Sequence, residues 1–140
     1  MNQEEIKFQI RSIDILAFSL KNSGTIIPEN TPFRFETKIE HRINSAEKTI
    51  MVISSFNIFC EETKNDMGNA EISCVYHIEN IQQFMDESGK FVLPSPLVTM
   101  FNSISISTCR GVLFTLFRGT PLHSVILPII NPQDFSNTNI

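Results

Sequence analysis

Strict alternation of side chains distinguishes the stretch from Phe33 to Ile43. One parity carries only Phe, Thr, Ile and His, and the other carries only Arg, Glu and Lys. Because successive side chains of a strand point to opposite faces, this pattern predicts a strand with one covered face and one face in water. The rest of the chain must therefore supply an antiparallel sheet around this strand and apolar material over one side of it.

Three other stretches also predict strands. Residues 6–20 are rich in Ile and Phe, but their apolar residues change parity twice, which requires either a bulge or two half-buried faces. Residues 49–60 are apolar on both parities, which predicts a central strand covered on both faces. Residues 70–81 alternate again, and polar turns at 44–48 and 61–69 would join the last three strands into an antiparallel meander. The inward residues of the fourth strand would be Ile72, Cys74, Tyr76 and Ile78.

One segment, residues 96–117, has the spacing of a helix. Pro96 suits a first helical turn with Ser95 as its cap, and the apolar residues that follow include i, i+3, i+4 and i+7 spacings. The Ser-Ile-Ser-Ile-Ser run at 103–107 alternates like a strand, and a strand there would give an all-β sandwich. We expect a helix. The predicted fold is therefore α+β, a single domain over residues 1–140 with a four-stranded antiparallel sheet and one long helix packed on one face.

Charge and hydropathy exclude several classes of function. The net charge is -4, and the basic residues are scattered, whereas nucleic-acid binding needs clustered Lys and Arg. No apolar run reaches the ~18 residues that span a bilayer, and the acidic N-terminus lacks the apolar region of a secretory signal. We expect a cytoplasmic protein without membrane insertion. Its 12 Phe, against one Tyr and no Trp, suit cores or apolar grooves.

Motifs for catalysis or metal binding are missing from the sequence. The three histidines lie on separate predicted elements without ligand spacing: His41, His77 and His123. No thiol or hydroxyl has a base beside it, and there is no Gly-rich phosphate loop, so we expect no enzyme activity, cofactor or metal. Cys60, Cys74 and Cys109 have no redox spacing, and we expect buried, reduced thiols. Cys60 and Cys74 could be neighbours across a hairpin, although a cytoplasmic setting disfavours a disulfide.

The C-terminal end resembles a known family. Arg118-Gly119-Thr120 follows the predicted helix, then comes an apolar strip with Leu127-Pro128-Ile129, and then Asp134-Phe135. With the order of the predicted elements, these stretches resemble the bacterial export chaperone SecB over roughly residues 6–135. The resemblance implies an ATP-independent holdase for unfolded polypeptides or preproteins, assembled as a dimer and a dimer of dimers.

The resemblance leaves the partners open. In SecB the Asp-Phe pair begins a second helix and then a basic, metal-binding tail that engages the translocase motor. This sequence stops at Ile140, so we expect a divergent or minimal member that lacks both. SecB-like proteins are also partners of toxin-antitoxin pairs, so the sequence is compatible with either role.

A polypeptide-binding groove is expected between the helix and the start of the second strand. Its predicted lining is Ile27, Phe33, Phe35, Phe101 and Phe114. Arg118 and Gly119 would be structural, closing the helix and turning the chain. The alternative is a domain for a specific partner or small ligand, in which the Phe side chains line a closed pocket. Such a protein would be monomeric or dimeric and would not bind dyes for exposed apolar surface.

Overall fold

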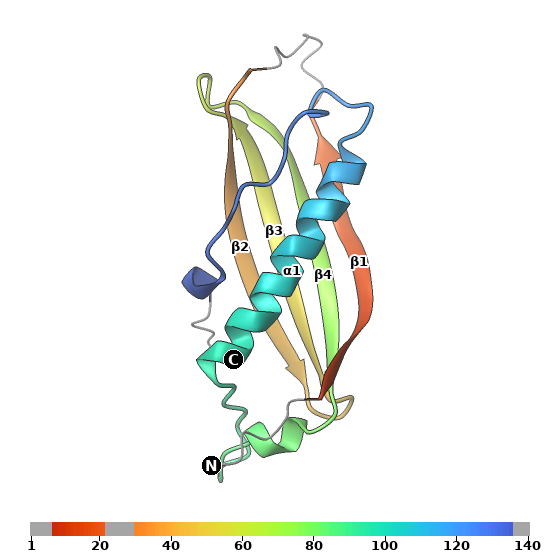
Figure 1. Ribbon diagram of the computed structural model, residues 1–140, viewed down its shortest axis with the longest axis vertical. Coiled ribbons are helices and arrows are strands. Elements are labelled where there is room, and N and C mark those ends of the chain that lie inside the picture. Colours follow the sequence, from red (N-terminus) through yellow and green to blue (C-terminus); the bar gives the residue numbers. More distant parts are fainter. Residues whose placement is uncertain (1–6, 22–29, 136–140) are drawn as a thin grey trace.

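A computed structural model describes residues 7–21 and 30–135 of the chain. One long helix lies obliquely across one face of a four-stranded antiparallel sheet, which confirms the predicted α+β fold (Figure 1). The strands are β1 (Phe8–Leu20), β2 (Phe33–Asn44), β3 (Thr49–Cys60) and β4 (Asp66–Ile78). The helices are α1 (Ser95–Leu116) and the short 3-10 helices η1 (Ile81–Phe84) and η2 (Pro132–Phe135).

The strand order is β1-β4-β3-β2. The last three strands form the predicted meander, while β1 pairs with β4, so β1 and β2 are the two edges. The loop predicted at 61–69 is shorter, because β4 already begins at Asp66. A tight turn makes this possible: Lys64 has a positive φ of 62°, and its amide donates to the Cys60 carbonyl at 2.8 Å. The fourth strand also ends earlier than predicted, because Ile81 begins η1.

Two bulges resolve the irregular pattern of β1. Its register with β4 shifts between Ile10 and Ser12 and again between Ile15 and Ala17. Each shift adds one residue, which returns the apolar side chains to the face that α1 covers. Ile15 therefore lies opposite Ile72, which is fully buried. Of the two alternatives that the sequence left open, the bulge is confirmed.

Strand β3 is central, as predicted, but among the described residues a helix covers only one of its two faces. The side chains that face α1 are buried, among them Val52, Phe56 and Ile58. On the other face no described helix or strand covers the sheet (Figure 1). Ile53 is nevertheless buried there, because it lies between Glu40 of β2 and Ser73 of β4, and long charged side chains can cover apolar neighbours with their stems.

Helix α1 includes the Ser-Ile-Ser-Ile-Ser run that alternates like a strand. Ser105 and Ile106 are both buried against the sheet, so tertiary packing overrides the weak helix propensity of this run. Ser105 also forms a hydrogen bond of 2.7 Å with the Tyr76 hydroxyl. The cap differs from the prediction, since Ser95 is the first helical residue and Pro94 is the N-cap, without a side-chain hydrogen bond.

By length and composition alone, α1 could cross a membrane. Its apolar side chains have another explanation, because they fill the interface with the sheet. Phe101, Cys109 and Leu113 are fully buried there. The core divides along the helix into a cluster around Phe101 and a second cluster around Leu113 and Phe117. In this structure α1 is therefore the core helix of the domain.

Candidate functional site

The chain that follows α1 returns across the same face of the sheet. We call residues 120–131 the return strip; in Figure 1 it leaves the C-terminal end of α1 and passes over the sheet toward β2. Its side chains alternate, since Val125 and Leu127 are buried while Ile126 is exposed. Arg110 fastens the strip to the helix, because its guanidinium donates to the carbonyls of Leu127 and Pro128 at 2.9 Å each. The strip thus covers the β2 side of the sheet that α1 leaves open.

A turn built around Arg118 and Gly119 begins this return. Gly119 has a φ of 75°, in the left-handed region that favours glycine, and a Cβ there would meet no atom within 4 Å. The requirement for glycine is therefore one of backbone conformation and not of space. The Arg118 guanidinium lies 4.0 Å from the centre of the Phe114 ring and donates to the carbonyls of Phe114 and His123. These contacts join the last turn of the helix to the start of the return strip.

A hollow with a volume of about 220 Å³ lies between the start of β2 and the return strip. The residues that line it come from both segments: Thr31, Phe33, Phe35, Ser124, Val125, Ile126 and Pro128. We call it the β2 hollow. Phe33 and Phe35 share one face of β2, and Ile126 lies at the hollow with 58% of its surface exposed. Within residues 7–21 and 30–135, β2 pairs with β3 alone, so its outer backbone edge beside the hollow has no strand partner there.

The structure separates the residues predicted for a groove. Phe33 and Phe35 line the β2 hollow. Phe101 does not, because it is fully buried and packs against Tyr76 with ring centres 4.7 Å apart. Phe114 is outside the lining set, although 44% of its surface is exposed. Ile27 lies outside the described residues.

Sequence reasoning missed the contribution of the return strip to this hollow. The sequence predicts an apolar strip after the helix, whereas the predicted groove includes none of its residues. The signal was present in the sequence, since Val125, Ile126 and Leu127 are consecutive apolar residues in an extended stretch before Pro128. In an extended chain such a run places successive side chains on opposite faces, so one face of the strip turns away from the sheet.

A short chain of hydrogen bonds connects β2, α1 and η2 near the middle of the helix. The Nε2 atom of His41 lies 2.6 Å from Oδ1 of Asn102, and the Asn102 amide donates to the Pro132 carbonyl at 3.3 Å. Burial lowers the pKa of His41, although the hydrogen bond with Asn102 opposes that shift. The partner of this histidine is an amide and not a carboxylate or a nucleophile. The arrangement is suited to holding segments together.

The lowered pKa of His41 predicts that acid weakens the fold. Below its ordinary pKa of 6.5, histidine binds a proton in the unfolded chain more readily than in the native protein. The free energy of unfolding therefore decreases as the pH falls from 7 through 6.5 toward the lower native pKa. Urea unfolding of His41→Gln at several pH values should show a weaker dependence over this range. The exposed His123→Gln is the control, and equal slopes in all three proteins would contradict the assignment.

The cysteines are not arranged as a hairpin pair. Cys60 lies opposite Phe33 at the end of β3, whereas Cys74 lies opposite Val52, so the two are not cross-strand neighbours. A hydrogen bond with Cys109 lowers the pKa of Cys74 to about 7. All three are free and buried. Among the described residues, no group of three or more His, Cys, Asp or Glu side chains could hold a metal ion.

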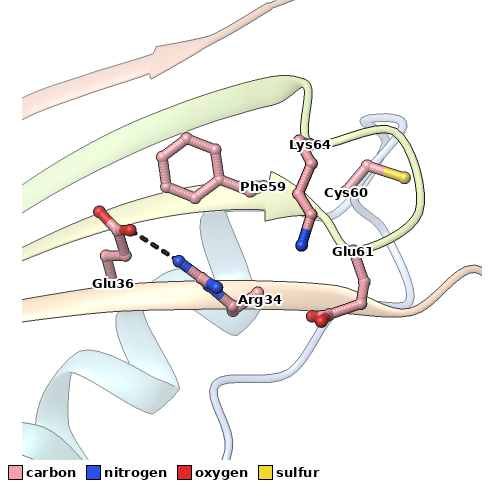
Figure 2. A pocket seen from close by; sticks show the side chains of 6 residues that line it. All are labelled: Arg34, Glu36, Phe59, Cys60, Glu61 and Lys64. Atoms are coloured by element: carbon pink, nitrogen blue, oxygen red, sulfur yellow. Dashed lines mark hydrogen bonds and ion pairs between the residues drawn. The ribbon is translucent and has the colours of Figure 1, made fainter.

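A second hollow lies on the opposite face of the sheet, where β3 ends. Figure 2 shows the side chains that line it: Arg34, Glu36, Phe59, Cys60, Glu61 and Lys64. Arg34 and Glu36 form an ion pair of 2.9 Å, and both are about half exposed. The Cys60 sulfur points away from that ion pair. The hollow has a volume of about 170 Å³ and carries two charges of each sign, so it favours no single ligand chemistry.

The arrangement of the sheet, the helix and the return strip matches a known fold. A sheet in the order β1-β4-β3-β2, one long helix across it and an apolar strip returning over the same face form a SecB-like fold. The Mycobacterium tuberculosis Rv1957 SecB-like chaperone, solved in complex with a ChAD peptide from the Rv1956 HigA1 antitoxin, has this fold with a TM-score of 0.59. That likeness covers 88% of this chain and 89% of the other at 12% sequence identity, which shows a common fold.

Other comparisons add little. A protein of unknown function from Streptococcus agalactiae aligns over 89% of this chain and 99% of its own at 14% identity, but the TM-score is 0.32. No protein-family model matches this sequence, and no curated protein matches it. The comparisons therefore show the fold.

Proposed function

We propose that this protein is an ATP-independent holdase that binds non-native polypeptides in extended form along the β2 hollow. The observation that carries the proposal is a hollow lined by Phe33, Phe35 and Ile126 beside an edge strand that has no second strand partner among the described residues. An extended chain can pair its backbone with such an edge while every second side chain enters the hollow. Phe33, Phe35 and Ile126 offer apolar contacts that tolerate many side chains. The SecB-like neighbour, which was solved with a bound peptide, supports polypeptide as the ligand class.

The size of the hollow favours a polypeptide over a small ligand. Pockets for small ligands usually have volumes of roughly 300–1,000 Å³ and bury most of the ligand. The β2 hollow has about 220 Å³, which suits one or two side chains. One side of the hollow is formed by the outer edge of β2, which has no strand partner among the described residues. The closed pocket considered as an alternative is therefore the less suitable reading of this site.

The client class and the location complete the proposal. We propose a cytoplasmic protein whose clients are unfolded preproteins or an antitoxin, and the peptide bound to the neighbour comes from an antitoxin. The two candidate partners beyond the clients are the translocase motor and a toxin-antitoxin pair.

The direct test is suppression of aggregation. A reduced, unfolding client protein is followed by light scattering at a near-stoichiometric ratio and without nucleotide. We expect the scattering to stay low in the presence of this protein. Unchanged aggregation, together with a monomeric state of this protein, would contradict the holdase.

The other edge of the sheet supports assembly with further copies of the chain. Ile10, Ile13 and Ile15 on β1 are 44%, 46% and 49% exposed, although they face the same side as α1. An apolar edge strand of this length invites pairing with another chain. We propose that a second copy covers it in a dimer, and that two dimers associate. Symmetric burial would keep this edge from aggregating.

A charge on β1 should break this assembly. Ile13→Asp would place an unpaired carboxylate in the proposed interface, and we expect light scattering to show a shift toward the monomer. The matched control is Ile126→Asp, which is also exposed but lies at the opposite edge. That variant should keep the oligomeric state while binding clients more weakly. If Ile13→Asp and the unmodified protein have the same mass in solution, β1 is not the interface.

A further inference from the structure

The backbone groups of β2 divide between the two sides of the strand by parity. The Glu61 amide donates to the Pro32 carbonyl at 2.9 Å. Next in the register comes the pair of Phe33 with Cys60. Antiparallel pairs alternate between hydrogen-bonded and non-hydrogen-bonded, so Phe33 and Cys60 form a pair without backbone bonds. The Cys60 amide agrees with this, because it donates instead to the Asn65 carbonyl at 2.9 Å, in the turn before β4.

The residues of β2 that line the hollow also carry the outward backbone groups. Phe33, Phe35 and Thr37 share the parity that makes no backbone bond with β3, so their amides and carbonyls point to the outer side of β2. The side chains of Phe33 and Phe35 line the β2 hollow. A strand added at this edge would bond with these backbone groups and place every second side chain beside the hollow.

The other parity of β2 carries charges on the opposite face of the sheet. Arg34 and Glu36 form an ion pair of 2.9 Å (Figure 2). Arg42 and Glu40 form another of 3.2 Å. Lys38 lies between these pairs, is exposed, and takes part in no ion pair within residues 7–21 and 30–135. Near the middle of β2, one positive charge is therefore left for a neighbouring strand to compensate.

We propose that the preferred client segment is an added strand that bonds with the backbone of Phe33, Phe35 and Thr37 and places an acidic side chain against Lys38. This inference rests on the proposed client binding at the β2 hollow and names the chemistry of the client: apolar residues at one parity and an acidic residue at the other. A basic residue at that position would meet a like charge. Alternation is required because a slip of one residue turns the apolar side chains away from the hollow.

Two labelled peptides that differ at one position test the charge preference. Each has roughly nine residues, within the usual length of a strand, with Leu at every second position and Ser between. The central residue is Glu in one peptide and Lys in the other. Fluorescence anisotropy should show tighter binding of the Glu peptide by about two- to fivefold, the effect of one charge pair across strands. Lys38→Glu should reverse this preference, and Lys38→Gln should remove it.

The matched control for the charge is Lys48→Glu. Lys48 lies in the turn beyond the other end of β2, so this variant changes the net charge of the protein equally without changing the proposed contact. It should keep the preference for the Glu peptide. The same ratio of affinities in the unmodified protein and in Lys38→Glu would overturn the pairing with Lys38.

Methylation of peptide amides tests the backbone pairing. In one form of the Glu peptide the amides of all the leucines are methylated, and in the other form the amides of the residues between them. Alternate amides of a strand face its partner, so one form should lose affinity by at least about tenfold while the other keeps it. Which form binds tells whether the added strand is antiparallel or parallel. Equal affinities of the two forms would overturn the added strand.

A labelled, permanently unfolded client separates this inference from the proposed function. If the client binds but neither unmethylated peptide binds, the added strand is wrong and the holdase stands. If the client and the peptides all fail to bind, the holdase is wrong and this inference is wrong with it.

Discussion

Phe33→Asp is expected to weaken the binding of unfolded polypeptides by at least about tenfold, which corresponds to about 1.4 kcal/mol. Phe33 lines the β2 hollow with Phe35, and a client side chain that enters the hollow would bury the new carboxylate without a partner. The measurement is the fluorescence anisotropy of a labelled, permanently unfolded client titrated with each protein. Suppression of aggregation should decrease in the same proportion.

The matched control for this variant is Phe59→Asp. Phe59 lies at the same end of the sheet and is also half-buried, but it belongs to the hollow on the opposite face. It should leave client binding close to that of the unmodified protein, and Phe33→Leu should retain most of the binding because it keeps an apolar side chain. Circular dichroism checks that each variant is folded. If Phe33→Asp and Phe59→Asp reduce binding equally, the site is not the β2 hollow.

The strands and the helix could be predicted because their signals are local. Alternation with a period of two identified β2 and the buried face of β4, and the spacing of apolar residues identified α1 despite its serine run. The bulges in β1 were foreseen as one of two possibilities, since the change of parity is visible in the sequence. Which possibility holds depends on what covers the strand, and that is a tertiary property.

The candidate site could be predicted only in part. Phe33 and Phe101 both carry large apolar side chains in periodic segments, and periodicity alone does not distinguish a buried face from the rim of a hollow. Phe101 is fully buried because α1 crosses β4 and β3 at that point, whereas the start of β2 lies beyond the helix. The burial of Phe101 depends on the rotation of the helix over the sheet, which no residue spacing encodes.

Phe117→Ala is expected to lower the free energy of unfolding by about 3–5 kcal/mol, the range for removing a large aromatic side chain from a core. Phe117 is fully buried at the end of α1 and packs with Leu113, Leu122 and Leu127, so its loss opens a cavity beneath the return strip. Urea unfolding followed by circular dichroism measures the difference.

The control is Phe114→Ala, three residues earlier on the same helix. Its ring is partly exposed and contacts Arg118, a contact that contributes about 0.5–1 kcal/mol at such sites, so a loss near 1 kcal/mol is expected. Equal losses from the two variants would mean that the return strip does not seal the core at Phe117.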